Sequence, residues 1–443
     1  MSTDQSRGAG AARGASSPQL MRQANRQALL RLALSDTPFT AAAAMAATGL
    51  TRATVLGVCT DLRDAGWLEE TAGERAGGGV AGAVRAGPRP QGQGTTGQRG
   101  RPARTYRLRS DAGVLVGIDA GEHTLTVQVT DLAGRPRATV SCSVPGGVAA
   151  GPAARVEALR ELIDRALAKA DARACRRVLT VIGVPAPVDE HGRSPRDEVG
   201  FWTTMNPGLV DALSDGAGPV LVENDANLAA IAEHAGGTGD HVVTLLMGER
   251  FGAGLIVDGR LLRGSAGGAG EMRFLDLALE DGHGADGVAA LARRWVLEQR
   301  AGQDDAAHGS PLARIPAERL TAVDVFRAAE AGDDLALAVL DRIGDRLARI
   351  VAILSSLLGV ETVVVAGAIA GAIEPVLDRA RRTLPQLAGP SCPEVIASEH
   401  GLEVVVHGAI ELALARLRED PLALLDPTRG DGSAAPARAP SLD

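Results

Sequence analysis

From Asp111 onward, short apolar segments alternate with amphipathic segments of helical period, and this alternation restricts the fold more than any other feature. Residues 114–121 and 362–366 have the length and the β-branched content of buried strands. Residues 153–172 instead place apolar side chains at the spacing of one helix face. Alternation of this kind predicts an α/β fold in which helices cover largely buried sheets.

No segment is typical of a membrane protein. The longest apolar run, at residues 363–373, is much shorter than the roughly 20 residues that a membrane helix needs. Residues 1–20 contain no apolar signal-peptide segment. We therefore expect a cytoplasmic protein with no membrane partner.

Charge is distributed unevenly along the chain. Residues 1–110 contain 15 arginines and 7 acidic residues, whereas the rest contains 31 basic and 47 acidic residues, for a net charge of −8. An electropositive region joined to an acidic body predicts that only the first region binds a polyanion, with nucleic acid as the first candidate. The expected organisation is a disordered tail (1–17), a DNA-binding domain (18–110), an α/β domain (111–425) and a second disordered tail (426–443).

Residues 18–65 predict three helices, with a tight turn between the second and the third. The second helix ends before Gly49, which can adopt the left-handed conformation of a helix end. Thr51 is then placed to cap a third helix. Helix, glycine-containing turn and helix form the helix-turn-helix arrangement, whose second helix lies in the DNA major groove. The exposed first turn predicts DNA contacts by Thr51, Arg52, Thr54 and Val55, whereas the inward set is Leu56, Cys59, Leu62 and Leu68.

Two strand-like segments follow these helices, on either side of a stretch rich in Gly, Ala and Pro. They are typical of a wing whose tip carries a flexible insertion at residues 77–98. Arg99, Arg101 and Arg104 are placed for contacts with the DNA backbone or minor groove. An alternative interpretation of residues 18–110 is a helical hairpin used for dimerisation, with the arginines as solvated surface charge.

Four motifs follow in order in the α/β region. Residues 117–121 are G-I-D-A-G, residues 223–227 are E-N-D-A-N, residues 252–264 are G-A-G-L-I-V-D-G-R-L-L-R-G, and residues 268–271 are G-A-G-E. With the preceding winged helix-turn-helix, this order resembles the ROK family of bacterial repressors and sugar kinases over nearly the whole chain. The resemblance implies a two-lobe actin-like (ribonuclease H-like) ATPase fold that closes over a sugar, with ATP in the same cleft in the kinases.

The resemblance also implies roles for individual residues. In the kinases of the family an aspartate removes a proton from the sugar hydroxyl, and glycine-rich hairpins approach the phosphates. Asp225 matches that base if the chain is an active kinase. The degenerate phosphate loops are matched by Asp119, Gly121, Gly248, Gly252 and Gly254. The sugar-binding positions are matched by Asn206, Glu223, Asn224, Asp225 and Glu271, whose side chains offer fixed hydrogen-bonding groups to hydroxyls.

Two alternatives concern the same motif. Asn224 and Asp225 are also placed to cap the helix that starts near Ala226, and capping alone explains their presence there. Trp202 lies close enough to Asn206 in the sequence to form a wall of the sugar site, although packing is the ordinary role of a tryptophan.

Two departures from the family pattern argue against catalysis. The kinases have G-T-G in the second hairpin, whereas this chain has Gly248-Glu249-Arg250, and Glu122 adds a carboxylate to the first hairpin. A fixed carboxylate 4 Å from a phosphate is repelled by about 1 to 4 kcal/mol, and Arg250 offers compensation for one of the two. The family's zinc motif is lost, because Phe274 replaces its histidine and residues 275–288 contain no cysteine. We therefore expect neither a metal nor ATP as a cofactor.

The sequence thus predicts a transcriptional regulator, most simply a repressor. It would bind double-stranded operator DNA as a homodimer or tetramer and sense a sugar or a sugar derivative in a catalytically degenerate domain. A second interpretation is an ATP-dependent sugar kinase with a DNA-binding head, which the retained Asp119 and Asp225 favour. A third is a DNA-binding repressor that responds to no ligand, which the loss of the zinc motif favours.

Overall fold

The computed structural model describes residues 18–71, 104–144, 146–197, 200–214, 216, 218–272, 279, 282, 284, 286–302, 309–389 and 392–425. The two expected tails and the expected insertion at residues 77–98 lie outside these ranges. The chain forms two compact units. The small unit holds the described residues up to Ser110 together with residues 420–425, and the large unit holds Asp111–Glu419.

The division at Ser110 coincides with the expected domain boundary, but the division near the carboxyl end does not. We expected the α/β domain to extend to residue 425. Helix α15 (Pro421–Leu425) instead packs against α1 of the small unit, and Leu425 is buried there. Sequence alone did not reveal this, because a five-residue apolar segment carries no signal of the surface that it covers.

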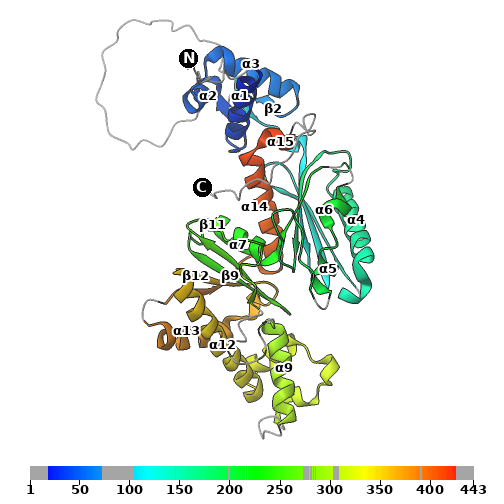
Figure 1. Ribbon diagram of the computed structural model, residues 1–443, viewed down its shortest axis with the longest axis vertical. Helices are drawn as coiled ribbons and strands as arrows, with labels where there is room; N and C mark the ends of the chain where they lie inside the picture. Colours follow the sequence, from blue (N-terminus) through cyan, green and yellow to red (C-terminus); the bar gives the residue numbers. More distant parts are fainter. Residues whose placement is uncertain are drawn as a thin grey trace, which may run out of the picture. The chain divides into compact units, whose positions relative to one another are not determined.

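The described part of the small unit contains helices α1 to α3, a three-stranded antiparallel sheet in the order β1-β3-β2, and α15 (Figure 1). Its core joins α1 to α3 through side chains that are fully buried: Leu29, Leu30, Val55, Cys59 and Leu62. The elements are α1 (Pro18–Ala33), β1 (Phe39–Thr40), α2 (Ala41–Thr48), α3 (Arg52–Asp64), β2 (Leu68–Thr71) and β3 (Thr105–Leu108).

The large unit contains two five-stranded mixed sheets with the same arrangement of strands. In each sheet the first three strands along the chain pair antiparallel with their neighbours. The first strand also pairs in parallel with the fourth, and the fifth strand lies beside the fourth. The first lobe holds β6-β5-β4-β7-β8: β4 (Val114–Ala120), β5 (Thr124–Thr130), β6 (Pro136–Ser143), β7 (Arg177–Val184) and β8 (Val220–Asn224). The second lobe holds β11-β10-β9-β12-β13: β9 (Val242–Met247), β10 (Phe251–Val257), β11 (Arg260–Leu261), β12 (Thr362–Ala366) and β13 (Glu394–Ala397).

Helices cover both faces of the sheets, as the buried β-branched strands require. Helices α7 and α14 pack against each other, with α14 on β4 and β7 of the first sheet and α7 on β9 and β10 of the second (Figure 1). The helices of the first lobe are α4 (Gly151–Lys169), α5 (Phe201–Met205) and α6 (Leu209–Leu213), and those of the second are α9 (Val288–Ala301), α11 (Ala322–Glu330), α12 (Asp334–Leu358) and α13 (Glu374–Ala388). Between the sheets lie α7 (Asp225–Ala235) and α14 (Val404–Glu419).

The backbone of α7 is approached closely from both sides. A Cβ atom added to Gly408 of α14 would lie 1.8 Å from the carbonyl oxygen of Leu228, and one added to Gly254 of β10 would lie 2.2 Å from that of Ala226. Such distances exclude any side chain at these two positions. The glycines therefore set how closely α14 and β10 approach the helix between them.

One predicted element near the carboxyl end is wrong. The sequence from Leu402 to Arg418 predicts a last strand followed by a helix, because it opens with the β-branched run Val404-Val405-Val406. These valines instead form the first turn of α14 and are buried. Tertiary packing against β4 and α7 outweighs strand propensity here. The fifth strand of the second sheet is β13, which is only four residues long and was not predicted.

Within the described ranges, no single helix is long and apolar enough to cross a membrane. Helices α2 and α3 reach the required length and apolar content only when they are taken together, and the chain bends by 110° between them.

Substitution Gly408→Ala tests the α7 and α14 contact. Alanine is favoured over glycine in a helix by about 0.5–1 kcal/mol, whereas forcing a methyl group into a closed contact costs about 1–3 kcal/mol. We therefore expect a net loss of stability and a lower melting temperature by calorimetry. Gly371→Ala, where an added Cβ meets nothing within 4 Å, is the matched control. An unchanged melting temperature for Gly408→Ala would contradict the contact.

Candidate functional site

A cavity of about 910 Å³ lies in the large unit, where the two lobes meet. The turns of two equivalent hairpins line it, namely β4–β5 in the first lobe and β9–β10 in the second. The first residues of α7 and α14 complete it. Its charged and aromatic lining consists of Asp119, Glu122, His123, Arg196, Asp197, Phe201, Trp202, Asp225, Glu249, Arg250, Phe251 and Glu271.

Two half-buried carboxyl groups of the cavity, those of Asp119 and Asp225, have raised pKa values. Burial raises the pKa of Asp119 to about 7, although the charge of Arg155 and a hydrogen bond from the Gly121 amide oppose the rise. Burial raises the pKa of Asp225 to about 8, and the nearby charges of Asp119 and Glu271 add to that effect. Each group can therefore hold or release a proton near neutral pH, as a base or as a hydrogen-bonding partner of a hydroxyl.

Arg155 fixes the first hairpin and was not found by sequence analysis. It is 2% exposed, and its guanidinium donates to the carbonyl oxygens of Gly121 (2.9 Å), Met205 (3.1 Å) and Ala120. The positive charge lies close to Asp119. The available signal was an arginine on the otherwise apolar face of α4, which also carries Leu159 and Leu162.

Asn224 caps α7 and also lines the cavity. Its Oδ1 accepts a hydrogen bond from the amide of Asn227 (3.0 Å) and so caps α7, while its Nδ2 donates to the carbonyl oxygen of Ala186 (3.1 Å). It also lines the cavity together with Asp225 and Glu271. Trp202 lines the cavity as well, on the side of the first lobe.

Glu223 supports the cavity wall from behind. It is 4% exposed, and its Oε1 accepts from the Asn224 amide (3.0 Å) and from Asn227 Nδ2 (2.9 Å). Its Oε2 pairs with Arg263 at 2.7 Å. These contacts engage the carboxylate within the protein, and Glu223 is not among the residues that line the cavity.

Asn206 is also engaged by the protein itself. Its Nδ2 donates to Gly192 O and Ser194 Oγ, each at 3.0 Å, and its Oδ1 accepts from the Leu209 amide at 3.3 Å. The side chain is 6% exposed. It thus braces the loop before α6 rather than facing the cavity.

Each hairpin turn carries a carboxylate that an arginine neutralises. Glu122 in the first turn lies 3.3 Å from Arg250 Nε, and Glu249 in the second turn is bound by both terminal nitrogens of Arg293, one of them at 2.6 Å. Gly121, Gly248 and Gly252 line the cavity at these turns, whereas Gly254 packs against α7. The turns therefore present paired charges where the resemblance implied phosphate-binding backbone.

The segment expected to have lost its zinc ligands is only partly described. Glu271 and Met272 lie at its start, whereas Phe274 and His283 are outside the described ranges. Among the described residues, no group of three or more His, Cys, Asp or Glu side chains is arranged to hold a metal ion.

The small unit presents a capped helix after a sharp turn. Gly49 ends α2 in the left-handed conformation (φ 70°), and Thr51 caps α3 by accepting from the Thr54 amide at 3.3 Å. Thr51 and Arg52 are exposed and Thr54 is half-buried. The predicted exposure of Val55 is wrong, because its side chain is fully buried in the core between α1 and α3.

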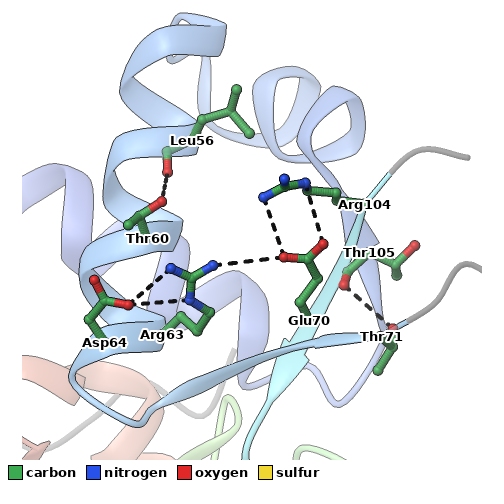
Figure 2. Close-up of polar contacts among 8 residues, drawn as sticks. All are labelled: Leu56, Thr60, Arg63, Asp64, Glu70, Thr71, Arg104 and Thr105. Carbon is green, nitrogen blue, oxygen red and sulfur yellow. Dashed lines mark hydrogen bonds and ion pairs between the residues drawn. The ribbon is translucent and has the colours of Figure 1, made fainter. Parts of the chain in front are cut away.

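A chain of charges joins the end of α3 to the paired strands β2 and β3 of the three-stranded sheet. Figure 2 shows Glu70 between Arg63 of α3 and Arg104 at the start of the ribbon. The Arg104 Nε to Glu70 Oε1 distance is 3.3 Å, and Arg63 Nη1 to Glu70 Oε2 is 3.8 Å. Arg63 also pairs with Asp64 at 3.0 Å. Glu70 thus orients Arg104, while Arg99 and Arg101 lie outside the described ranges.

Two sheets of equal topology that meet at this cavity define a sugar-kinase-like α/β protein. The chain belongs to the ROK family, whose profile matches residues 115–416. A solved ROK family transcriptional regulator, a homologue of the Escherichia coli MLC protein, has a TM-score of 0.67 and 20% identity, covering 91% of this chain and 99% of its own. That likeness shows the fold.

Two relatives show the range of functions to which the chain is similar. A glucokinase of Halalkalibacterium halodurans is 33% identical over 179 residues, which are 36% of this chain and 52% of the relative. The DNA-binding transcriptional dual regulator NagC of Escherichia coli is 26% identical over 282 residues, which are 59% of this chain and 65% of NagC. The chain thus spans about half of the first relative and about two thirds of the second.

The raised pKa of Asp225 predicts a pH-dependent stability. Because its folded-state pKa of about 8 lies above the ordinary value of 3.8, this group's contribution is fully present below about pH 4 and is lost as the pH rises toward 8. Asp225→Asn removes that loss, because asparagine does not ionise. The substitution also removes the stabilisation of about 0.3–1 kcal/mol that a carboxylate gives at the start of a helix. The cost of ionisation is larger, because each unit of pKa shift corresponds to about 1.36 kcal/mol.

We therefore expect Asp225→Asn to exceed the wild type in free energy of unfolding by about 1 kcal/mol or more at pH 8, with little difference at pH 4. Urea unfolding at both pH values measures this. Asp211→Asn, on the exposed surface of α6, is the control for loss of one charge. A wild type that is more stable than Asp225→Asn at pH 8 would contradict the burial cost.

Proposed function

We propose that the protein is a DNA-binding transcriptional regulator, most simply a repressor, and that a sugar or sugar derivative in the cavity controls it. The observation that carries this proposal is the α2 and α3 pair, two helices bent by 110° across a glycine turn with an exposed, capped start of α3. This is the geometry of a helix-turn-helix, and β2 and β3 supply the wing. The likeness to NagC supports the same function.

DNA recognition divides between the two parts of this motif. The first turn of α3 brings Arg52 and the hydroxyls of Thr51 and Thr54 to the base edges, where an arginine pairs best with guanine. The arginines of the wing, Arg104 among them, contact phosphates and set the register. Since helix-turn-helix proteins bind paired half-sites about one DNA turn apart, the active species is a dimer or a pair of dimers.

The cavity is proposed to bind the effector without turnover. Asn224, Asp225 and Glu271 supply hydrogen-bonding groups for hydroxyls, and Trp202 supplies an apolar wall. Glu122 and Glu249 lie at the two turns where a triphosphate would need backbone amides and hydroxyls instead. Release from DNA requires the effector to favour one state of the protein by about 5.5 kcal/mol, which converts a 99:1 population into 1:99.

A second candidate function is an active sugar kinase with a DNA-binding head. The likeness to the Halalkalibacterium halodurans glucokinase and the perturbed pKa of Asp225 favour it. A coupled assay of ATP consumption with glucose, N-acetylglucosamine and related sugars distinguishes the two functions. We expect no turnover above background. Turnover that Asp225→Asn abolishes would replace our proposal by the kinase.

Thermal-shift measurements with the same sugars test the alternative that the protein is a DNA-binding repressor that responds to no ligand. Under our proposal at least one sugar raises the melting temperature, and Asn224→Ala removes the effect. If no sugar does so while operator binding is intact, the cavity has no effector role. Sequencing of genomic fragments retained by the purified protein identifies the operator for these experiments.

Substitution Arg52→Ala tests the DNA-binding surface. Loss of one bidentate contact to a base costs about 1–3 kcal/mol, so the operator dissociation constant should rise by roughly 5- to 150-fold while nonspecific binding changes little. Fluorescence anisotropy at fixed salt measures both. Arg327→Ala, an exposed arginine of α11 in the large unit, is the charge-matched control. Unchanged operator affinity for Arg52→Ala would remove Arg52 from the interface.

A further inference from the structure

One side chain of the second lobe is held by two groups of the first. Arg250 lies at the β9–β10 turn, and its Nε is 3.3 Å from Oε2 of Glu122 in the β4–β5 turn. Its guanidinium carbon lies 3.6 Å from the centre of the Phe201 ring on α5. All three residues line the cavity. The contact therefore spans the cavity between the turns of two topologically equivalent hairpins.

Contacts within the first lobe hold the backbone of both partners of Arg250. Phe201 is 6% exposed, and its amide donates to Asp197 Oδ2 at 2.8 Å. Glu122 follows Gly121, whose carbonyl oxygen accepts a hydrogen bond from the buried Arg155. A preformed acceptor and a preformed ring reduce the entropy that is lost when the arginine docks.

The second lobe in turn presents Arg250. The backbone of Arg250 accepts from the Gly248 amide at 3.1 Å and forms a β-bridge with Asp286. The neighbouring carboxylate of Glu249 is bound by Arg293 of α9, within the same lobe. Because Glu249 is satisfied in this way, the guanidinium of Arg250 is directed to the opposite lobe.

A second ion pair between the lobes differs in burial. Arg263, just after β11, pairs with Glu223 at the end of β8, and their side chains are 22% and 5% exposed. Breaking a buried pair leaves an uncompensated charge and is strongly unfavourable. The Arg250 and Glu122 side chains are 50% and 22% exposed, and an ion pair of that kind opens at small cost. Stacking on Phe201 adds a cation–π attraction to it.

We propose that Arg250, Glu122 and Phe201 form a latch that holds the two lobes together across the cavity without a nucleotide. In this arrangement the chain's own guanidinium and carboxylate take the place between the two hairpin turns that phosphates would occupy in a kinase. The Arg263–Glu223 pair is the permanent contact and the latch is the one that opens. The inference rests on the proposed function only in taking the cavity as the effector site.

Distances between spin labels on the two lobes test the latch. Glu157→Cys on α4 and Arg327→Cys on α11 place labels at exposed positions of the first and second lobes. Cys142, Cys175 and Cys392 are changed to Ser. Cys59 is retained, because burial raises its pKa to about 11 and keeps it an unreactive thiol. The full-length protein is measured by double electron–electron resonance with neither DNA nor sugar present.

The wild type should give one narrow distance distribution. Arg250→Ala removes the ion pair and the stack and should increase the population at longer distances about tenfold. Glu122→Gln removes only the charge and should increase it about threefold, and Arg250→Lys, which keeps the charge but not the planar stack, should fall between the wild type and Arg250→Ala. Arg342→Ala removes an ion pair with Glu298 and a cation–π contact with Trp295, both within the second lobe, and should leave the distribution unchanged. The exchanged pair Glu122→Arg with Arg250→Glu should restore much of the narrow distribution.

Distributions for Arg250→Ala and Glu122→Gln that both match the wild type would overturn the latch. If Arg250→Ala fails to fold by circular dichroism, Arg250→Lys and the exchanged pair carry the test, and equal distributions for these and the wild type have the same meaning. The measurement involves neither DNA nor effector. The latch can therefore be disproved while the regulator proposal stands, and the regulator proposal can be disproved while the latch stands.

Discussion

The packing of α7 between the two sheets is the constraint on which the cavity depends. Asp225 is the first residue of this helix, and Asn224 caps it. Because β10 and α14 approach the α7 backbone at Gly254 and Gly408, the helix has no room to shift, and its first turn is fixed at the junction of the lobes. Rigid placement of this kind allows a carboxyl group to be buried at a cost in free energy that the surrounding packing offsets.

The acidic groups around the cavity are accommodated in three ways. Asp119 and Asp225 have pKa values raised to about 7 and about 8, so protonation relieves part of their repulsion near neutral pH. Glu249 is neutralised within one lobe by Arg293, whereas Glu122 is neutralised across the cavity by Arg250. Both hairpin turns therefore carry an ion pair at the cavity.

Much of the fold could be predicted from the sequence, because buried strands and amphipathic helices differ in period, and the order of the four motifs identified the family. Local signals also placed the Gly49 turn and the Thr51 cap. Long-range contacts escaped prediction. Arg155, Arg263 and Arg293 carry no signal of their partners, and neither Glu223 nor Asn206 could be recognised as a support behind the cavity rather than part of its lining. The run Val404-Val405-Val406 misled because strand propensity yields to tertiary packing.

The position of α15 has a consequence for how the protein matures. The small unit begins at α1, near the start of the chain, yet the helix that covers part of α1 is made of residues 421–425. A ribosome therefore synthesises the large unit, Asp111–Glu419, before this unit can complete its core. Chains that terminate prematurely would lack the buried Leu425 and would leave part of α1 uncovered. The core of the small unit is thereby completed only after the large unit has been synthesised.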